Sequence, residues 1–228
     1  MKKLTCFLIA MLTVTLVLPA GAQLRVGIVG GMNIADLNVE VQNQPADVSS
    51  RTLFGIGGVV VLPLSQTMSL RFEPMYLQKG IGATELAIQP GVEYKSKSSY
   101  LELPLFLKAE FGNSIRPYIM AGPSIGILLS SDIEATVSSI TFKGDAQDAT
   151  KNIDVSAAFG AGVSYPVGKS TIFFEGRYFL GLTNTVKGGS IEMRAGAVSQ
   201  AIDWDKNTDK IENRGLHFMA GVTFPLSK

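Results

Sequence analysis

Apolar and polar residues alternate along much of this chain, in segments of about ten residues each. In the segment 100–111, every second residue is Leu, Ala or Phe, and the residues between them include Glu102, Lys108 and Glu110. Successive side chains of a strand point to opposite faces of a sheet, so this period predicts strands with one apolar and one polar face. Eight segments carry the pattern: 24–33, 52–62, 68–79, 99–111, 116–129, 153–165, 171–183 and 215–225.

The connections between these segments alternate strictly between short and long. The short ones are 63–67, 112–115 and 166–170, and the long ones are 34–51, 80–98, 130–152 and 184–214. Outer-membrane barrels have short periplasmic turns and long outer loops, and their tilted strands need about 9–11 residues. The sequence therefore predicts an all-β fold, an eight-stranded antiparallel up-and-down transmembrane β-barrel with short periplasmic turns and four long extracellular loops.

The first 22 residues have the layout of a secretory signal peptide. Lys2 and Lys3 form a basic start, residues 4–18 are apolar, and small residues follow before Gln23. No later apolar run is long enough for a membrane helix. We therefore expect 1–22 to be a cleaved signal peptide and 23–228 to be one barrel domain in the cell outer membrane.

Charge and cysteine content narrow the function classes. The chain has 20 Lys and Arg against 19 Asp and Glu, so removal of Lys2 and Lys3 leaves 18 against 19. This balance gives no electrostatic reason to expect nucleic acid as a partner. Cys6 is the single cysteine and lies in the predicted signal, so the exported part has no disulfide and no Cys metal site.

The size of the side chains indicates which face lies inside. The apolar faces are bulky, whereas the polar face of the sixth segment carries Ser156, Ala158, Gly160, Gly162 and Ser164. Small residues suit the narrow interior of an eight-stranded barrel. We therefore expect the polar face inside and the apolar face toward lipid. The alternative is a soluble periplasmic lipocalin-like ligand binder, in which the apolar face would point inward.

This orientation directs charged side chains into the lumen. Buried charges are tolerated when they are paired and hydrogen-bonded. We expect a structural ion-pair network that fills the barrel, with a proton or ion pathway as the functional alternative. The predicted network consists of Arg71, Glu73, Glu102, Lys108, Glu110, Arg116, Glu175 and Arg177.

The sequence predicts no catalytic, cofactor-binding or metal site. His217 is the only histidine and is expected to be a hydrogen-bonded filler of the lumen. An enzyme site would pair it with a serine such as Ser156 or Ser164, but no metalloprotease or nucleotide-binding motif accompanies them.

The last long connection contains the single tryptophan and three nearby aspartates. Trp204 is a candidate contact residue for a surface partner, although packing of the loop on itself is the favoured interpretation. Asp203, Asp205 and Asp209 could bind calcium, but their spacing does not fit the EF-hand pattern, which favours a solvated loop.

Five segments of the chain carry a family resemblance: VGIVGGMNIADL (26–37), FEPMYLQKG (72–80), YLELPLFLK (100–108), PYIMAGPSIGILLS (117–130) and FFEGRYFLGLTN (173–184). Together they resemble the PorT-like outer-membrane β-barrel proteins of Bacteroidota, in order and over essentially the whole predicted mature chain. The resemblance implies an outer-membrane barrel, and the founding member of that family is linked to type IX protein secretion. Phe224 is set back from the C-terminus, unlike the final aromatic residue of many such barrels.

We therefore expect a non-enzymatic outer-membrane protein that is structural or binds a partner through its surface loops. The expected partners are outer-membrane lipid, the barrel-assembly machinery during biogenesis, and a surface or secretion-system protein. No cofactor is expected. An accessory role in type IX secretion is the functional alternative.

Overall fold

The alternating segments form strands of a single antiparallel sheet. The computed structural model describes residues 23–85 and 91–226, so the predicted signal peptide 1–22 lies outside the described residues. No helix in these ranges is long and apolar enough to cross a membrane. The sheet contains fourteen strands within the described residues: β1 (Arg25–Val41), β2 (Gln44–Ala46), β3 (Arg51–Pro63), β4 (Met68–Phe72), β5 (Met75–Lys79), β6 (Thr84–Glu85), β7 (Val92–Glu110), β8 (Arg116–Val137), β9 (Ile140–Asp145), β10 (Ile153–Val167), β11 (Ser170–Gly181), β12 (Gly189–Ala195), β13 (Val198–Trp204) and β14 (Lys210–Pro225).

The strand pairings return to their starting strand. The circuit runs from β1 to β3, then to β4 and β5, and on through β7, β8, β10, β11 and β14. β14 then pairs with β1 over sixteen residue pairs, from Arg25 with Pro225 to Glu40 with Lys210. The sheet is therefore closed and has an inside and an outside.

Each of the eight predicted segments lies in this circuit. The segment 68–79 is divided into β4 and β5 at Glu73 and Pro74, because proline has no N–H for a ladder hydrogen bond. The neighbours still bridge the break, since Gly58 N–H donates to Pro74 O at 2.9 Å and Glu73 N–H donates to Pro104 O at 3.2 Å. β4 and β5 thus occupy one position in the circuit.

The outer face of the closed sheet is apolar and the inner face is polar. On β11, Phe174 and Tyr178 are 58% and 42% exposed, whereas Glu175 and Arg177 are 5% and 1% exposed. The expected placement of the polar face inside is confirmed. A lipocalin-like barrel, with its apolar face inside, is excluded by this orientation.

The prediction of four long loops is wrong, because strands continue into all four segments. On β1, outward residues change from the apolar Ile28 and Met32 to the exposed Asp36, while the buried inward residues change from Asn33 to Leu37. The amphipathic pattern is therefore inverted beyond about Asp36. The predicted strand ends near this point because its outward residues stop being apolar. The backbone pairing of β1 with β14 nevertheless continues.

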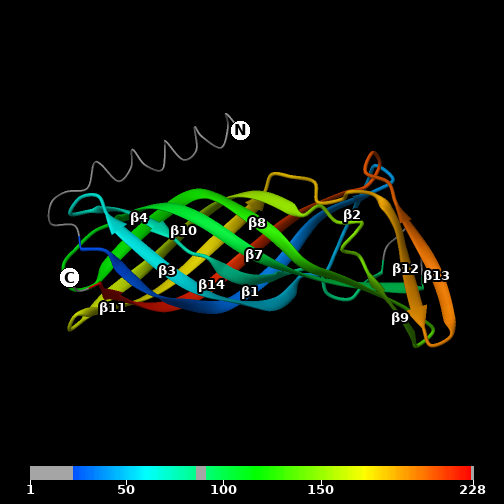
Figure 1. Ribbon diagram of the computed structural model, residues 1–228, viewed down its shortest axis with the longest axis horizontal. Helices are drawn as coiled ribbons and strands as arrows, with labels where there is room; N and C mark the ends of the chain where they lie inside the picture. Colours follow the sequence, from blue (N-terminus) through cyan, green and yellow to red (C-terminus); the bar gives the residue numbers. More distant parts are fainter. Residues whose placement is uncertain (1–22, 86–90, 227–228) are drawn as a thin grey trace.

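The continued strands form an extension at one end of the circuit. β9 pairs with β8, and β12 pairs with β9 and β13. Figure 1 shows β9, β12 and β13 beyond this end. Buried apolar residues support the extension in two clusters. One cluster contains Tyr94, Ile133, Ala135, Ala146, Ala149, Ile191 and Met193, and the other contains Leu37, Val39 and Ile81.

The opposite end of the circuit, which we call the turn end, has short connections. The turns 64–67, 111–115 and 168–169 lie there, close to the three predicted short connections. The two ends of the described chain meet at the same place, where Leu226 N–H donates to Leu24 O at 2.7 Å. The left side of Figure 1 shows this end.

Substitution of Gly221 should disrupt the closed sheet. A methyl group at this inward position on β14 would overlap the Phe173 ring and the backbone carbonyl of Ile28. We expect Gly221→Val to lower the free energy of unfolding by at least about 1–3 kcal/mol, as overpacking does. The measurement is the urea midpoint of the refolded protein in lipid vesicles. Ala220→Val is the control on the exposed outer face, and equal loss of stability in both variants would contradict the close approach.

Candidate functional site

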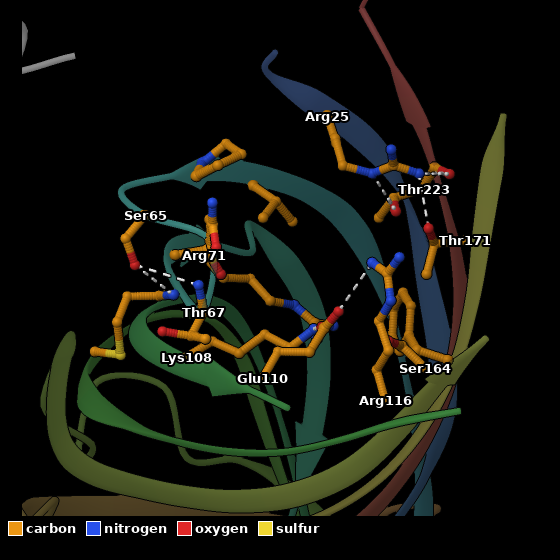
Figure 2. Close-up of a pocket in the computed structure, with 16 residues that line it drawn as sticks. Arg25, Ser65, Thr67, Arg71, Lys108, Glu110, Arg116, Ser164, Thr171 and Thr223 are labelled. Atoms are coloured by element: carbon orange, nitrogen blue, oxygen red, sulfur yellow. Dashed lines mark hydrogen bonds and ion pairs between the residues drawn. The ribbon is translucent and has the colours of Figure 1, made fainter. Parts of the chain in front are cut away.

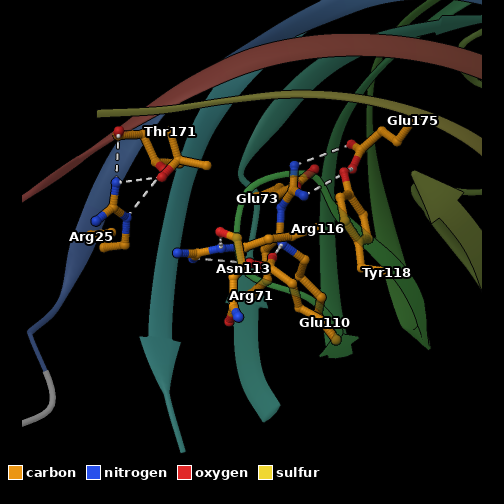
Figure 3. A network of polar contacts seen from close by, with 11 residues as sticks. Arg25, Arg71, Glu73, Glu110, Asn113, Arg116, Tyr118, Thr171 and Glu175 are labelled. Carbon is orange, nitrogen blue, oxygen red and sulfur yellow. Dashed lines mark hydrogen bonds and ion pairs between the residues drawn. The ribbon is translucent and has the colours of Figure 1, made fainter. Parts of the chain in front are cut away.

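Two arginines and two glutamates meet inside the circuit, and we call Arg71, Glu73, Glu175 and Arg177 the central cluster. Arg71 forms a two-pronged pair with Glu175, with Nη1–Oε2 at 2.8 Å and Nη2–Oε1 at 3.1 Å, and it also pairs with Glu73 (Figure 3). Arg177 pairs with Glu175, and its Nη2 lies 2.6 Å from Glu73 Oε2. Each buried charge therefore has two partners of opposite sign, which offsets its desolvation.

The central cluster crosses the interior from wall to wall. Arg71 lies on β4 and Glu175 lies on β11. Three positions of the circuit separate these strands on either side: β3, β1 and β14 on one side, and β7, β8 and β10 on the other. The ion pairs therefore join opposite walls, which backbone hydrogen bonds do not reach.

Small residues and aromatic rings shape the space around this cluster. The Tyr118 hydroxyl donates a hydrogen bond to Glu175. A Cβ atom at Gly162 would lie 2.7 Å from the Tyr118 ring, so the glycine leaves the room that the ring occupies. The Arg71 guanidinium lies 4.2 Å from the Phe173 ring centroid, which is close enough for a cation–π attraction to the ring face.

A second buried group joins Glu102 to two residues that the predicted network did not include. Lys79 Nζ lies 2.9 Å from both Glu102 Oε2 and Asp154 Oδ2. Ser124 donates to Glu102 at 2.6 Å, and Asn213 donates to Asp154 at 2.8 Å. Lys79 lies an even number of residues from Arg71, and Asp154 lies two residues from Ser156. The alternation of side chains along a strand could therefore have identified both as inward residues.

The remaining predicted charges form a third group at the turn end. Glu110 pairs with Lys108 and also with Arg116, whose Nη1 lies 3.4 Å from Glu110 Oε1. Lys108 Nζ lies 3.9 Å from the Tyr118 ring centroid, which connects this group to the surroundings of the central cluster. The structure therefore divides the eight predicted residues among three groups.

His217 is buried against an aromatic ring. It stacks on Phe179 with 4.3 Å between ring centroids and an interplanar angle of 10°. Within the described chain, His217 Nδ1 and the buried hydroxyls of Ser156 and Ser164 have no hydrogen-bond partner. The expectation of a hydrogen-bonded histidine is therefore wrong for Nδ1, and neither Ser156 nor Ser164 forms a hydrogen bond with His217.

A pocket of about 380 Å³ opens in the extension. Burial raises the pKa of the Tyr94 hydroxyl, which lies on the pocket wall. Trp204 lies at the end of β13, rather than in a loop, and packs against the apolar cluster of the extension. The apolar wall includes Leu37, Val39, Val41, Val48, Ile81, Tyr94, Ile133, Ile202, Trp204 and Ile211.

Two of the three aspartates near Trp204, Asp205 and Asp209, hold local turns. Asp209 accepts hydrogen bonds from the backbone N–H groups of Gln42 and Asp205, at 3.0 and 2.9 Å. Asp205 accepts a hydrogen bond from the Asn207 N–H at 2.9 Å. In the part of the chain that the structure describes, no three His, Cys, Asp or Glu side chains are grouped as a metal site requires.

The comparisons with known proteins agree on the architecture. Residues 19–187 match the family model described as outer membrane protein beta-barrel domain. A major outer membrane protein of Thermus thermophilus is similar in structure, with a TM-score of 0.54, 9% identity, and coverage of 90% of this chain and 100% of that one. Neisserial surface protein A has a TM-score of 0.48, 15% identity, and coverage of 90% and 99%. At 9% identity, the likeness to the Thermus thermophilus protein is one of fold. No curated protein matches the sequence.

Loss of one charge from the central cluster should strongly destabilise the protein. Glu175→Gln leaves Arg71 and Arg177 with a single carboxylate, that of Glu73, and removal of one partner from a buried ion pair costs about 3–5 kcal/mol. The measurement is the urea midpoint in phosphatidylcholine vesicles. Glu192→Gln, which removes a partner of Arg194 in an exposed pair, is the control and should leave the midpoint unchanged. Equal midpoints for Glu175→Gln and wild type would contradict the assigned pairing.

Proposed function

We propose that this chain, which belongs to the family of outer membrane protein beta-barrel domains, is a non-enzymatic binding protein with a filled lumen. The outer membrane is its location. The observation that carries the binding role is the apolar pocket in the extension, whose rim is acidic. In this proposal the charged interior supports the barrel, and the extension meets the ligand.

The closed circuit is proposed to cross the membrane as an eight-stranded up-and-down barrel. β4 and β5 would form one transmembrane strand, interrupted at Pro74. Closure supports this proposal because backbone groups in lipid must find their partners within the protein. The apolar outer band also supports it, as in Phe174 and Ile119, which are 58% and 61% exposed. The transmembrane strands would be β1, β3, β4 with β5, β7, β8, β10, β11 and β14.

The unequal ends support one orientation in the membrane. Barrels of this type have short turns in the periplasm and longer connections outside. We place the turn end in the periplasm and the extension outside the cell. Residues 1–22 would be the cleaved export signal and 23–228 the barrel domain, which the barrel-assembly machinery would insert into outer-membrane lipid.

The interior is proposed to have a structural role. Its carboxylates are engaged by arginine, lysine and hydroxyl groups, as Glu175 is by Arg71 and Tyr118. The hydroxyls of Ser156 and Ser164 form no hydrogen bond with His217. These contacts support neither a nucleophile nor a proton acceptor that is free to act on a substrate.

The pocket in the extension has the composition of a small-molecule site. Its volume of about 380 Å³ lies in the usual range of roughly 300–1,000 Å³. Apolar residues from β1, β7, β8, β13 and β14 form its wall, so the packed strands fix its shape. We therefore propose that Trp204 contacts the ligand of this pocket. The sequence alone suggests it only as a contact residue for a surface partner.

The acidic rim identifies the class of ligand. Four carboxylates line the pocket, those of Glu40, Asp203, Asp205 and Asp209, and no Lys or Arg is among its described lining residues. A ligand with an apolar body and a cationic head matches both parts of the site. We therefore propose a cationic amphiphile as the ligand.

Fluorescence of Trp204 gives a direct test, because it is the only tryptophan of the chain. We expect octyltrimethylammonium to change the emission of the full chain in phosphatidylcholine vesicles with a saturable curve. Octyl sulfate should bind at least about tenfold more weakly, because its charge matches that of the rim. Asp203→Asn should weaken cation binding about threefold, as loss of a partly exposed charge pair does.

The control for this experiment is Glu192→Gln, which lies in the extension but does not line the pocket. It should leave the binding curve unchanged. A linear response that is equal for both amphiphiles would mean partition into the bilayer and would exclude the site.

The PorT-like segments favour a second candidate, an accessory role in type IX secretion in a member of the Bacteroidota. FEPMYLQKG (72–80) and FFEGRYFLGLTN (173–184) both resemble that family, and they supply Glu73 and Glu175 of the central cluster from opposite walls. In this role a secretion-system protein would be the partner. Normal export of secreted cargo from a deletion strain would exclude it.

A further inference from the structure

The turn end contains a second cavity, of about 190 Å³, which is separate from the pocket in the extension. Its lining comes from several strands that meet at this end, including β1, β4, β7, β8, β10 and β11. Figure 2 shows Arg25, Lys108 and Arg116 around it, together with Ser164 and Thr171. Its volume is below the roughly 300 Å³ of a drug-sized site, so a small ligand would fit it best.

Positive charge exceeds negative charge around this turn-end cavity. Arg71 also lines it, but Glu73 and Glu175 balance that charge. Among the other described lining residues, Arg25, Lys108 and Arg116 face a single carboxylate, Glu110, which Lys108 and Arg116 share. Two positive charges therefore remain without a counter-charge among the described lining residues.

Arg25 is held in place by neutral groups. Its Nη2 donates to Thr171 Oγ1 at 2.8 Å, to Thr223 O at 3.2 Å and to Lys169 O at 3.2 Å, and its Nε donates to Thr223 Oγ1 at 3.3 Å. These bonds fix the guanidinium and leave its charge unneutralised. These bonds use Nε and Nη2, so the Nη1 group of the fixed guanidinium remains to donate to a phosphate or carboxylate oxygen.

Ser164 provides an independent indication of a ligand. Its side chain lines the cavity and is 1% exposed, and its hydroxyl has no hydrogen-bond partner in the structure. A buried hydroxyl without a partner is unfavourable. An anion in the cavity would accept a hydrogen bond from this group while it neutralises the excess positive charge.

We propose that the turn-end cavity is a binding site for a small oxyanion of the phosphate class. Arg25 and Arg116 supply charge, Lys108 supplies a third cation, and the Ser164 hydroxyl donates a hydrogen bond. Arg25, Lys108, Arg116 and Ser164 lie on the inner side of the closed sheet, away from the apolar outer face. The source of the anion is therefore the aqueous compartment at the turn end, and a phospholipid headgroup is the alternative source of the same chemistry.

The test is calorimetric titration of the full chain with inorganic phosphate in dodecyl maltoside, a detergent that contains no phosphate. Chloride balances the ionic strength throughout. We expect saturable binding of one phosphate per chain. Arg25→Gln and Arg116→Gln should each raise the Kd at least about tenfold, since each removes a charged donor. Arg194→Gln, an exposed cation of the extension, should leave the Kd unchanged.

Ser164→Ala distinguishes a ligand contact from a structural role. We expect a Kd that is about three- to tenfold higher, with no loss of thermal stability in the absence of phosphate, because the hydroxyl has no partner to lose. Every variant is first checked for the compact band on unheated gels. The absence of saturable binding, or equal Kd values for wild type, Arg25→Gln and Arg116→Gln, would overturn the proposal.

A second arm separates the two sources of the anion. Phosphatidylglycerol is added to the micelles before the phosphate titration. Unchanged phosphate affinity supports a free anion. Competition that raises the apparent Kd in wild type but not in Arg116→Gln would assign the cavity to a lipid headgroup and would overturn the assignment to a free anion.

Discussion

The closed sheet encloses a narrow interior, and the charges buried in it must be paired within the protein. The central cluster meets this constraint with ion pairs that run from β4 to β11, across the interior. Arg71 is 1% exposed and Glu73 is fully buried, so both charges are shielded from bulk solvent. Glycine on the inner face also makes this pairing possible, since Gly162 leaves the space that Tyr118 needs to reach Glu175.

The same constraint accounts for the two ends of the molecule. The middle of the interior is filled, and the cavities lie on either side of it. At the turn end, Arg25 and Arg116 leave a positive excess, whereas the pocket of the extension combines apolar walls with Asp203 and Glu40. Because the two cavities carry opposite charge, we propose a cationic ligand for the pocket of the extension and an oxyanion for the turn-end cavity. The central cluster lies between the two cavities and keeps them apart.

Sequence patterns predicted the strands in the membrane zone and the side that faces inward. They succeeded because lipid outside and a narrow lumen inside impose one alternation, as in Phe174 next to Glu175. They failed beyond Asp36, where the exposed residues become polar and the buried residues, such as Leu37, become apolar, although the strand continues. They also missed the pairing of Lys79 with Asp154. That contact joins two strands that are not neighbours in the sheet. Its geometry depends on the register of all the strands between them, which the alternation within one strand does not specify.

Ion conductance in a planar bilayer tests the filled interior most directly. The account predicts that the wild-type protein, once its insertion is shown by heat-dependent gel mobility, gives no sustained current steps. A combined variant with alanine at Arg71, Glu73, Glu175 and Arg177, folded by the same criterion, should conduct and so shows that the assay detects an open lumen. Sustained steps from the wild type would contradict the account, because they require a continuous water path where the structure places paired charges.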